Sequence, residues 1–521
     1  MKFLLSLTCL SLLSSIGWSQ NQAPVISHMS AEYEYRDRRL EVRFDLSDAE
    51  NDSLEVWALL SDDAGETFTA DFSAATGDVG PSIAPGTDKS IVWIAPHPIN
   101  FLDHRVKIIV NDGYTIDIQS MVDQVDSTRM KNDLLWLAQE RTSTPGPALD
   151  HLNAVKDSLE SIFTQGELEA YRHQKNLGTY TLENIIGRRV GLKHESISYL
   201  VDAHFDGVSG TDAADDNGSG TVGVMECARI LSQYEFAHSL RFIGFDQEET
   251  GLQGSIAYVT DEIPAYEVID GVLNFEMIGY YDDRPNSQQF PTGFEQLFPT
   301  LYNEVAQDSF RGNFITSVSN DQSNPLRLKF DSCAMAYVPD LLVRSFVTPA
   351  NGLLTPDLLR SDHAPFWQTN RPALMLTDGA EFRNHNYHSP GDSVATINMN
   401  FFHQVVKAAV ATLATLAQPL NADVSIAEFS LISGLSDLEE MCGLKIRHHD
   451  AQFELDLQQG NCVNASSSLT LIDLSGRVIH QVNIGPSFRH MTISTADLSP
   501  GIYLWTMESS KGILSEKVLI R

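Results

Sequence analysis

The strongest constraint on the fold is an alternation of short apolar strands and amphipathic helices between about residues 127 and 418. Histidine and carboxylate side chains follow directly where the strands end. The pattern predicts an α/β domain: a mostly parallel mixed sheet with helices on both faces. Ligands of such sheets bind beyond the carboxyl ends of the strands. The strand-like segments are 197–201, 240–245, 272–275 and 372–376, and helical patterns follow at 219–234 and 401–416.

These strand ends carry the ligand types that a hydrolytic zinc centre uses. Imidazole and carboxylate groups suit Zn²⁺, and one carboxylate can bridge two ions. The first strand leads to His204, and Asp206 stands where it can orient that imidazole ring. Glu248 and Glu249 are adjacent after the next strand, so that one can bind metal while the other acts as a general base. The remaining candidate ligands are Asp216, Glu276 and His388.

Six short segments carry these residues in a fixed order along the chain. They are 203–206 (Ala-His-Phe-Asp), 214–220 (Ala-Asp-Asp-Asn-Gly-Ser-Gly), 248–255 (Glu-Glu-Thr-Gly-Leu-Gln-Gly-Ser), 274–279 (Asn-Phe-Glu-Met-Ile-Gly), 360–364 (Arg-Ser-Asp-His-Ala) and 387–389 (Tyr-His-Ser). Together they resemble the bacterial two-zinc aminopeptidase family, whose relatives include glutamate carboxypeptidase II, glutaminyl cyclase and the transferrin receptor ectodomain. Each segment alone is a weak signal, but six in family order leave little room for a chance match.

The resemblance implies a set of metal ligands. Aligning the chain on Gly218-Ser219-Gly220 selects Asp216 rather than Asp215 as the bridge between the ions. At Glu276 the chain departs from the Asp that most of the family has. The longer arm leaves the geometry of the first metal open. The implied ligands are His204 and Glu276 for one zinc ion, Glu249 and His388 for the other, and Asp216 for both.

The resemblance also implies the catalytic roles. Glu248 would take a proton from the attacking water and return it to the leaving amine. Tyr387 would stabilise the carbonyl oxygen, and Arg360 would contact the substrate. The expected activity is that of a zinc exopeptidase acting on peptides, with aminopeptidase mode favoured. A glutaminyl-peptide cyclotransferase with one zinc ion and a metal-free binding ectodomain stay open as alternatives.

Several polar residues near the clusters have ordinary structural interpretations. We expect Asp215 to be a turn or cap residue and His363 to be a buried, hydrogen-bonded histidine. Cys227 follows the Asp216 cluster on a helical pattern, which predicts a free and inert thiol. We expect structural roles also for Asp362 and Asp378, and a solvated loop position for His385.

The N-terminal part contains two expected units. Residues 1–20 have the pattern of a signal peptide, with Lys2 before the apolar stretch 3–16. Residues 21–124 contain short strands broken by Gly, Asp and Pro, which predict a β-sandwich that resembles bacterial immunoglobulin- or fibronectin-like modules. The acidic turn at 48–52 is a possible Ca²⁺ site, although such turns are more often solvated.

The helical signal ends at Pro419, and residues 421–521 are expected to form a linker and a small β domain. The final strands resemble the C-terminal sorting domain of type IX secretion cargo, which implies secretion machinery as a partner. In an exported protein Cys442 and Cys462 can pair, and we predict that disulfide.

Composition excludes some partners. The 521-residue chain carries a net charge of −34, which argues against binding nucleic acid or an anionic membrane surface. Beyond the signal peptide, the sequence contains no segment apolar enough to span a bilayer. We therefore expect a secreted or cell-surface protein of several domains. Its oligomeric state and the side-chain preference of its substrate are left open.

Overall fold

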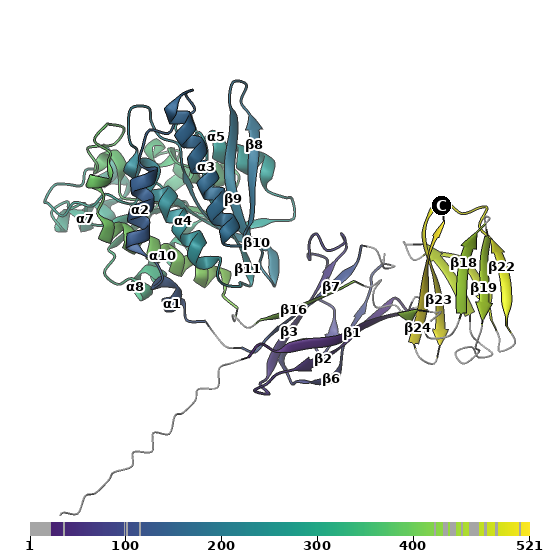
Figure 1. Cartoon of the computed structure of the whole chain (residues 1–521). Helices are drawn as coiled ribbons and strands as arrows, with labels where there is room; N and C mark the ends of the chain where they lie inside the picture. The colour runs from purple at the N-terminus through teal and green to yellow at the C-terminus, as the bar shows by residue number, and fades with distance from the viewer. Residues whose placement is uncertain are drawn as a thin grey trace, which may run out of the picture.

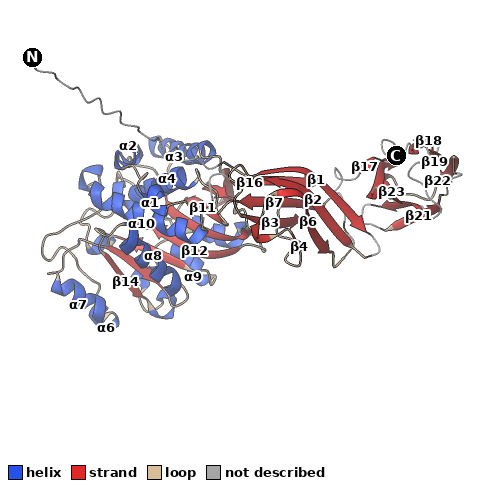
Figure 2. Ribbon diagram, turned by 90° about the horizontal axis from the view of Figure 1, so that it is seen from below, coloured by secondary structure: helices blue, strands red, loops and turns tan. Residues whose placement is uncertain are grey.

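The computed structural model forms three units, and in both views the β-sandwich lies between the other two (Figures 1 and 2). The predicted signal peptide and the cysteines Cys9, Cys442 and Cys462 lie outside the described residues. The described residues are 22–34, 37–97, 99, 103–113, 116–420, 424–430, 436–437, 444–449, 452–457, 468–473, 477–484, 488–509 and 512–520.

The largest unit is built on an eight-stranded sheet. Its four central strands β15, β12, β10 and β11 run parallel, and antiparallel pairs join them to both flanks. This arrangement confirms the predicted mixed, mostly parallel α/β fold. In spatial order the strands are β14 (Val343–Val347), β13 (Ile315–Ser319), β15 (Ala373–Thr377), β12 (Val268–Phe275), β10 (His194–His204), β11 (His238–Phe245), β9 (Thr181–Arg189) and β8 (Glu169–Asn176).

Helices cover both faces of this sheet, because successive strand side chains point to opposite faces. In β10, Val201 and Ala203 belong to one hydrophobic core, whereas Leu200 belongs to the other. The helices are α1 (Ile118–Val122), α2 (Ser127–Leu137), α3 (Pro147–Gln165), α4 (Gly220–Leu231), α5 (Gln253–Ala257), α6 (Phe294–Leu297), α7 (Pro299–Gln307), α8 (Asn324–Tyr337), α9 (His363–Gln368) and α10 (Met399–Ala417). Short helical turns complete the unit: η1 (Ala214–Ser219), η2 (Tyr258–Glu262), η3 (Pro349–Gly352), η4 (Pro356–Leu359), η5 (Ala380–Phe382) and η6 (Val394–Thr396).

Local sequence signals explain where the main helices start. Asp126 accepts hydrogen bonds from the backbone N–H groups of Thr128 and Arg129, which caps α2. Asn398 caps α10 in the same way, through the N–H groups of Asn400 and Phe401. The predicted inert thiol of Cys227 is free and buried within α4.

The N-terminal unit consists of two four-stranded sheets that enclose a common hydrophobic core. One sheet has the order β1-β2-β6-β4 and the other β16-β7-β3-β5. The strands are β1 (Val25–Glu34), β2 (Arg39–Ser47), β3 (Leu54–Ser61), β4 (Thr76–Gly77), β5 (Gly80–Ile83), β6 (Gly86–Ile94), β7 (Arg105–Asn111) and β16 (Ser425–Ser430).

The strand β16 differs from the sequence-based division, which placed residues 425–430 in the C-terminal part. It pairs antiparallel with β7 along its whole length, from Ser425 opposite Val110 to Ser430 opposite Arg105. The α/β unit is therefore inserted in the chain between two neighbouring strands of the sandwich. A short strand that pairs only across 300 residues of intervening chain carries no local signal of its partner.

Loss of β16 is expected to destabilise the sandwich. A chain ending at residue 420 leaves the edge of β7 unpaired, whereas a chain ending at residue 430 keeps it paired. At about 0.5–1.5 kcal/mol for each net hydrogen bond, the shorter chain should lose several kcal/mol of unfolding free energy. Urea unfolding followed by tryptophan fluorescence, to which Trp57 and Trp93 of the sandwich contribute, measures the difference. Equal midpoints for the two chains would contradict it.

The C-terminal unit contains a five-stranded and a three-stranded sheet. Ile472 and Leu504 of this unit pack into the hydrophobic core of the sandwich, so the two units share a contact. The strands are β17 (Ser436–Asp437), β24 (Gly512–Ile520), β23 (Gly501–Ser509), β20 (Ser468–Asp473) and β21 (Val478–Asn483) in one sheet, and β18 (Leu444–His449), β19 (Gln452–Leu457) and β22 (His490–Ser494) in the other.

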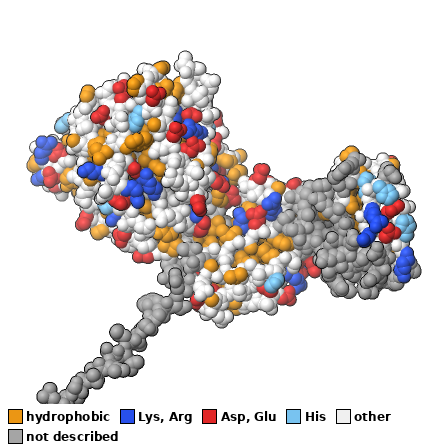
Figure 3. Space-filling view, viewed as in Figure 1, with side chains coloured by type: hydrophobic (Ala, Val, Ile, Leu, Met, Phe, Trp, Pro, Cys, Tyr) orange, Lys and Arg blue, Asp and Glu red, His pale blue; other side chains and the backbone are white. Residues whose placement is uncertain are grey.

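Two further observations concern the helices and the surface of the described residues. Within the part of the chain that the structure describes, no helix combines the length and the apolar character needed to cross a bilayer. On the face shown in Figure 3, acidic and basic side chains are interspersed over the described surface.

Candidate metal centre

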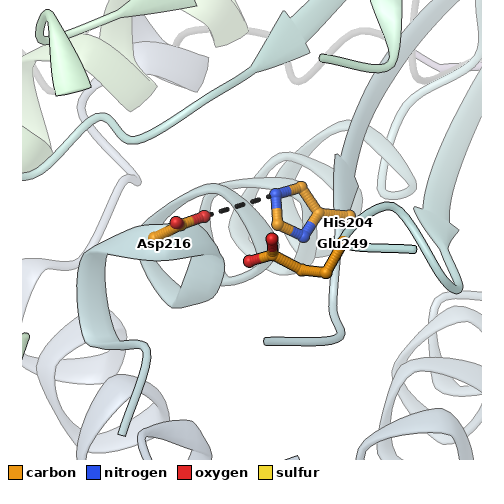
Figure 4. A group of neighbouring side chains, drawn as sticks. All are labelled: His204, Asp216 and Glu249. Atoms are coloured by element: carbon orange, nitrogen blue, oxygen red, sulfur yellow. Dashed lines mark ion pairs between the residues drawn. The ribbon is translucent and has the colours of Figure 1, made fainter. Parts of the chain in front are cut away.

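The predicted ligands meet at the carboxyl ends of three adjacent parallel strands. His204 is the last residue of β10, and it stands opposite Phe245, the last residue of β11. Glu249 follows β11 after a short turn, and Glu276 directly follows β12. The aligned strand ends explain why residues far apart in sequence share one site. Figure 4 shows the carboxylates of Asp216 and Glu249 beside the His204 ring.

Asp216 lies between the two histidines. Its Oδ1 is 3.5 Å from Nε2 of His204, and its Oδ2 is 3.1 Å from Nε2 of His388. Each oxygen of one carboxylate thus faces a different imidazole, which is the arrangement that a carboxylate bridging two ions requires. The structure brings these three residues together from η1, β10 and the loop that follows η5.

The spacing of the donor atoms fits zinc. Two ligand atoms at about 2.0–2.1 Å from one tetrahedral zinc ion are about 3.3 Å apart. Nε2 of His204 lies 3.6 Å from Oε2 of Glu276, and Nε2 of His388 lies 3.4 Å from Oε2 of Glu249. These separations resemble those to Asp216. Asp216 is thus within 3.5 Å of both histidines, and candidate ligand atoms of His204, Asp216 and Glu249 also lie within 4.8 Å of one another.

Glu276 lies within the candidate site, although its side chain is one methylene longer than the Asp that most of the family has at this position. Its Oε2 accepts a hydrogen bond of 2.6 Å from the Ser361 hydroxyl while it faces His204. It also belongs to a group with His204 and Glu248 whose candidate ligand atoms all lie within 4.8 Å of one another. The longer arm is thus accommodated in a position that keeps the carboxylate among the donors.

Glu248 stands slightly apart from the other donors. Its Oε2 lies 3.9 Å from Nε2 of His204, a longer separation than those between the paired ligands. Burial raises the pKa of Glu248 well above its usual value, against the opposing effect of His204. Glu248 also belongs to the group of candidate ligand atoms around His204, so its position allows either metal binding or proton transfer.

The electrostatics of the cluster call for a cation. Burial would lower the pKa of His204, but Glu248 and the neighbouring carboxylates outweigh it and raise that pKa well above its usual value. Hydrogen bonds to Asp216 and Glu249 raise the pKa of His388 to about 10. Burial and the charge of Asp216 raise the pKa of Glu249 to about 7, and the buried Oε1 of Glu249 has no hydrogen-bond partner. Excess negative charge and an unpartnered buried oxygen both fit a bound metal ion.

Two further aspartates hold the backbone of the ligand-bearing turns. The carboxylate of Asp206 accepts the N–H groups of Glu248 and Glu249, at 3.0 and 3.2 Å. It also lies 3.5 Å from Nδ1 of His204, the contact expected from the sequence. The carboxylate of Asp392 accepts the N–H groups of Asp215 and Asp216 in the same manner.

Asp392 was not among the site residues inferred from the sequence. It stands four residues after His388, and its partner residues lie about 176 positions earlier in the chain. In the sequence, the only indication of a role for Asp392 was its position close to the candidate ligand His388. The contact shows that the loop carrying His388 also supports the bridging carboxylate.

Tyr387 and Arg360 form a pair at the edge of the cluster. The Tyr387 ring stacks on the His388 ring, with centroids 3.8 Å apart. Arg360 donates hydrogen bonds to the Tyr387 oxygen and to Glu381, both at 2.8 Å. Because the phenolic oxygen accepts from Arg360, its own O–H can donate elsewhere. Burial raises the pKa of Tyr387, so that this proton is retained.

The residues with expected structural roles occupy positions consistent with such roles. Asp215 is buried and accepts hydrogen bonds from Ser219, Gly279 and Asn384. Nε2 of His363 lies 2.8 Å from the carbonyl oxygen of Leu358, and burial lowers the pKa of this histidine to about 4. The others follow: Asp362 accepts from Ser255, Asp378 accepts from the N–H groups of Tyr280 and Ala380, and His385 is exposed.

A cavity of about 190 Å³ opens beside the cluster, where Glu276, Arg360 and Tyr387 contribute to its wall. Its floor is the sheet face formed by β14, β13 and β15. Thr316 and Thr377 stand opposite each other nearest the ligand-bearing edge. One step further from that edge is an apolar row, and aromatic side chains of the α6–α7 region form a wall. That row is Phe346, Val318 and Met375, and the aromatic residues are Phe294 and Phe298.

Two family models match this chain. The model described as Peptidase family M28 matches residues 184–413. The model described as Secretion system C-terminal sorting domain matches residues 450–521. The first covers every predicted ligand of the metal centre, and the second covers most of the C-terminal unit.

Several individual proteins are similar to this chain. The chain is 33% identical over 301 residues to the uncharacterized protein YfbL of Escherichia coli, across 55% of this chain and 87% of that protein. It is 26% identical over 285 residues to leucine aminopeptidase 2 of Trichophyton equinum, across 50% of each chain, so it spans about half the length of that relative. The solved LapA aminopeptidase of Legionella pneumophila has 20% identity and a TM-score of 0.45, across 58% of this chain and 75% of LapA.

Proposed function

Because this chain belongs to peptidase family M28, we propose that it is a two-zinc aminopeptidase that removes large apolar residues from the N-termini of peptides. The observation that carries the proposal is Asp216, whose two carboxylate oxygens face His204 and His388 separately. The relative named leucine aminopeptidase 2 supports the aminopeptidase mode.

The sorting domain at residues 450–521 indicates export to the cell surface or the medium. The peptide substrate is therefore extracellular, and the secretion machinery is the partner of this domain. The Ca²⁺ site at 48–52 stays a prediction. In the structure the Asp48 carboxylate accepts the N–H of Asp52, which is an ordinary role for an acidic turn residue.

We assign the metal ligands to two half-sites. His204 and Glu276 would hold one zinc ion, His388 and Glu249 the other, and Asp216 both. Bound zinc lowers the pKa of a water molecule and polarises the substrate carbonyl. The side chains around the ions then have to move one proton and stabilise one developing negative charge.

Glu248 would move the proton. Its carboxylate accepts the proton of the attacking water and delivers it to the amine that leaves when the peptide bond breaks. The N–H groups of Glu248 and Glu249 are both fixed by Asp206, which holds the base in register with its neighbouring ligand. Tyr387 would donate its O–H to the carbonyl oxygen as charge develops there, with Arg360 keeping the ring in place.

The cavity beside Glu276 supports the substrate class. It meets the cluster at Glu276, Arg360 and Tyr387, so the side chain that enters it belongs to the residue whose carbonyl is attacked. A cavity of about 150 Å³ lined by Leu, Ile and Phe is enough to hold benzene, and this one measures about 190 Å³. Its apolar row suits an aromatic or large branched side chain.

A substrate panel tests the function and the side-chain preference together. Phe- and Leu-p-nitroanilide should have kcat/KM values at least tenfold above that of Ala-p-nitroanilide, because each buried methylene contributes about 1–3 kcal/mol. Lys- and Asp-p-nitroanilide should be cleaved more slowly than either apolar substrate. N-acetylated substrates should resist, and a chelator should abolish all hydrolysis. If the N-acetylated substrates were cleaved as fast as the substrates with a free amino group, the aminopeptidase mode would be overturned.

The Val318→Phe variant locates the preference in the cavity. Val318 is fully buried in the centre of the apolar row, so a ring at this position fills the space. We expect kcat/KM for Phe-p-nitroanilide to fall at least tenfold and that for Ala-p-nitroanilide to change less than threefold. Val268→Phe, at an exposed position at the start of β12, is the matched control and should leave the panel unchanged.

A further inference from the structure

The loop between α2 and α3, residues 138–146, contacts two of the ligand-bearing turns from outside the family match. That match begins at residue 184, whereas the loop precedes it by about 40 positions. The loop touches the backbone of 205–213, which connects His204 to the turn of Asp216, and it touches Gln247, which precedes Glu248. We call residues 138–146 the clamp loop.

Arg141 is the centre of the clamp loop. Its side chain is fully buried, and its guanidinium donates to backbone carbonyl oxygens of the 205–213 segment. The distances are 2.7 Å to Phe205, 2.9 Å to Asp212 and 2.7 Å to Ala213. Its own carbonyl oxygen accepts the N–H of Gly207 at 3.0 Å. One residue thus ties both ends of the segment that separates two metal ligands.

Two neighbours extend the same contact. Glu140 accepts hydrogen bonds from the hydroxyl of Ser209 and the N–H of Gly210, at 2.8 and 3.1 Å. Ser143 donates to the side-chain oxygen of Gln247 at 3.1 Å. Gln247 adopts a positive φ of 61°, a strained conformation that persists only when surrounding contacts hold it. The clamp loop therefore reaches both the first and the second ligand-bearing turn.

The chemistry of Arg141 suits positioning and not ligand binding. The five N–H groups of a guanidinium form a rigid fork, and here the fork engages carbonyl oxygens of chain segments that have no regular secondary structure. Burial lowers the pKa of Arg141 to about 10, and the charges of Asp392, Asp206 and Asp216 oppose this effect. Without the fork, the buried carbonyl oxygens of Phe205 and Ala213 would lack these donors.

We propose that Arg141 is a positioning residue, through which the clamp loop fixes the 205–213 segment and so sets the separation of the donor atoms of His204 and Asp216. The inference rests on the proposed function, because it concerns the same metal centre. It assigns part of the site to a segment that the family match does not include. Substitution of Arg141 should therefore weaken zinc binding in a protein that still folds.

The test compares Arg141→Met with Arg241→Met in the full chain. Met keeps the length of the side chain but removes every donor. Arg241 is the matched control, because it is also buried but lies in the first half of β11 and pairs with Glu267, away from the ligand-bearing edge. Both variants should lower the Tm. Only Arg141→Met should raise the zinc Kd, by ten- to a hundredfold, and lower kcat by a similar factor with KM within threefold.

Hydrogen exchange supplies a readout that does not depend on activity. The amides of Gly207, Asp215 and Asp216 should exchange at least tenfold faster in Arg141→Met and unchanged in Arg241→Met. Glu140→Ala, at an exposed position, should also raise the exchange rates of these amides, by a smaller factor. It keeps the test decisive if Arg141→Met fails to fold.

Two results would overturn the inference. One is a zinc Kd and kcat within threefold of the wild type, for each folded molecule of Arg141→Met. The other is unchanged exchange at those amides in both clamp-loop variants. Failure of the proposed function looks different, since wild-type protein would then cleave no aminoacyl substrate. The exchange comparison decides the inference in that case too.

Discussion

Glu248→Gln is expected to lower kcat by roughly 10²- to 10⁴-fold while the protein keeps its zinc. The substitution preserves size and removes the basic oxygen that accepts the proton of the attacking water. Glu248 lies 3.9 Å from Nε2 of His204, further than the paired ligands, so its loss should spare the metal. Steady-state kinetics on Leu-p-nitroanilide and zinc content by atomic emission measure the two effects.

The control for this variant is Glu295→Gln, at an exposed position on α6, which should keep both activity and zinc. Two outcomes separate the roles of the adjacent acids. Loss of zinc along with activity in Glu248→Gln would make Glu248 a ligand, and full activity would remove it from the mechanism. Glu249→Gln should instead lose one zinc ion, because Glu249 faces His388 at 3.4 Å.

Asp216→Ala is expected to lose both zinc ions and at least 10³-fold in kcat/KM. One carboxylate faces both histidines, so its removal takes a ligand from each half-site at once. His388→Ala removes a ligand from only one half-site and should retain about one ion per chain. Removing a ligand from a site with about three protein ligands leaves too few donors for tight binding. Zinc counting after dialysis against a weak chelator gives the stoichiometry of each variant.

The same count discriminates among the candidate functions. Two ions in the wild type, one in His388→Ala and none in Asp216→Ala support the two-zinc peptidase. One ion in the wild type, with cyclisation of Gln-initiated peptides, would support a glutaminyl cyclase. A wild-type protein without metal and without activity would support a binding ectodomain. Equal zinc content in wild type and Asp216→Ala would remove Asp216 from the site.

The sequence predicted the fold class of the α/β unit because its signals are local. Strand and helix periodicity acts within a few residues, and so do the helix caps that the structure shows at Asp126 and Asn398. The same holds for the sorting domain, whose family match confirms the expectation from its final strands. The strand β16 shows the limit, since its partner β7 lies more than 300 residues earlier.

The candidate site, too, could be predicted only in part from the sequence. Residue types predicted the candidate donors, because a zinc centre needs imidazole and carboxylate groups, and the family resemblance assigned them to two ions. No local sequence pattern indicated Asp392 or Arg141. Their contacts with the ligand-bearing segments are hydrogen bonds to backbone groups at least 64 positions away. The cavity could not be predicted from the sequence either, because its floor combines three strands that are adjacent only in the folded sheet.

By itself the sequence predicted which side chains could bind metal and determined which secondary structure carries them. The first prediction rests on residue types and on the family resemblance, and the second is a local property of periodicity. Only the tertiary structure decided that the two oxygens of Asp216 face different histidines, that Glu276 reaches the cluster, and that Arg141 supports it from outside the matched region. Those facts depend on distances of a few ångströms between distant segments, and such distances exist only once the strands, turns and loops that carry these residues have packed together.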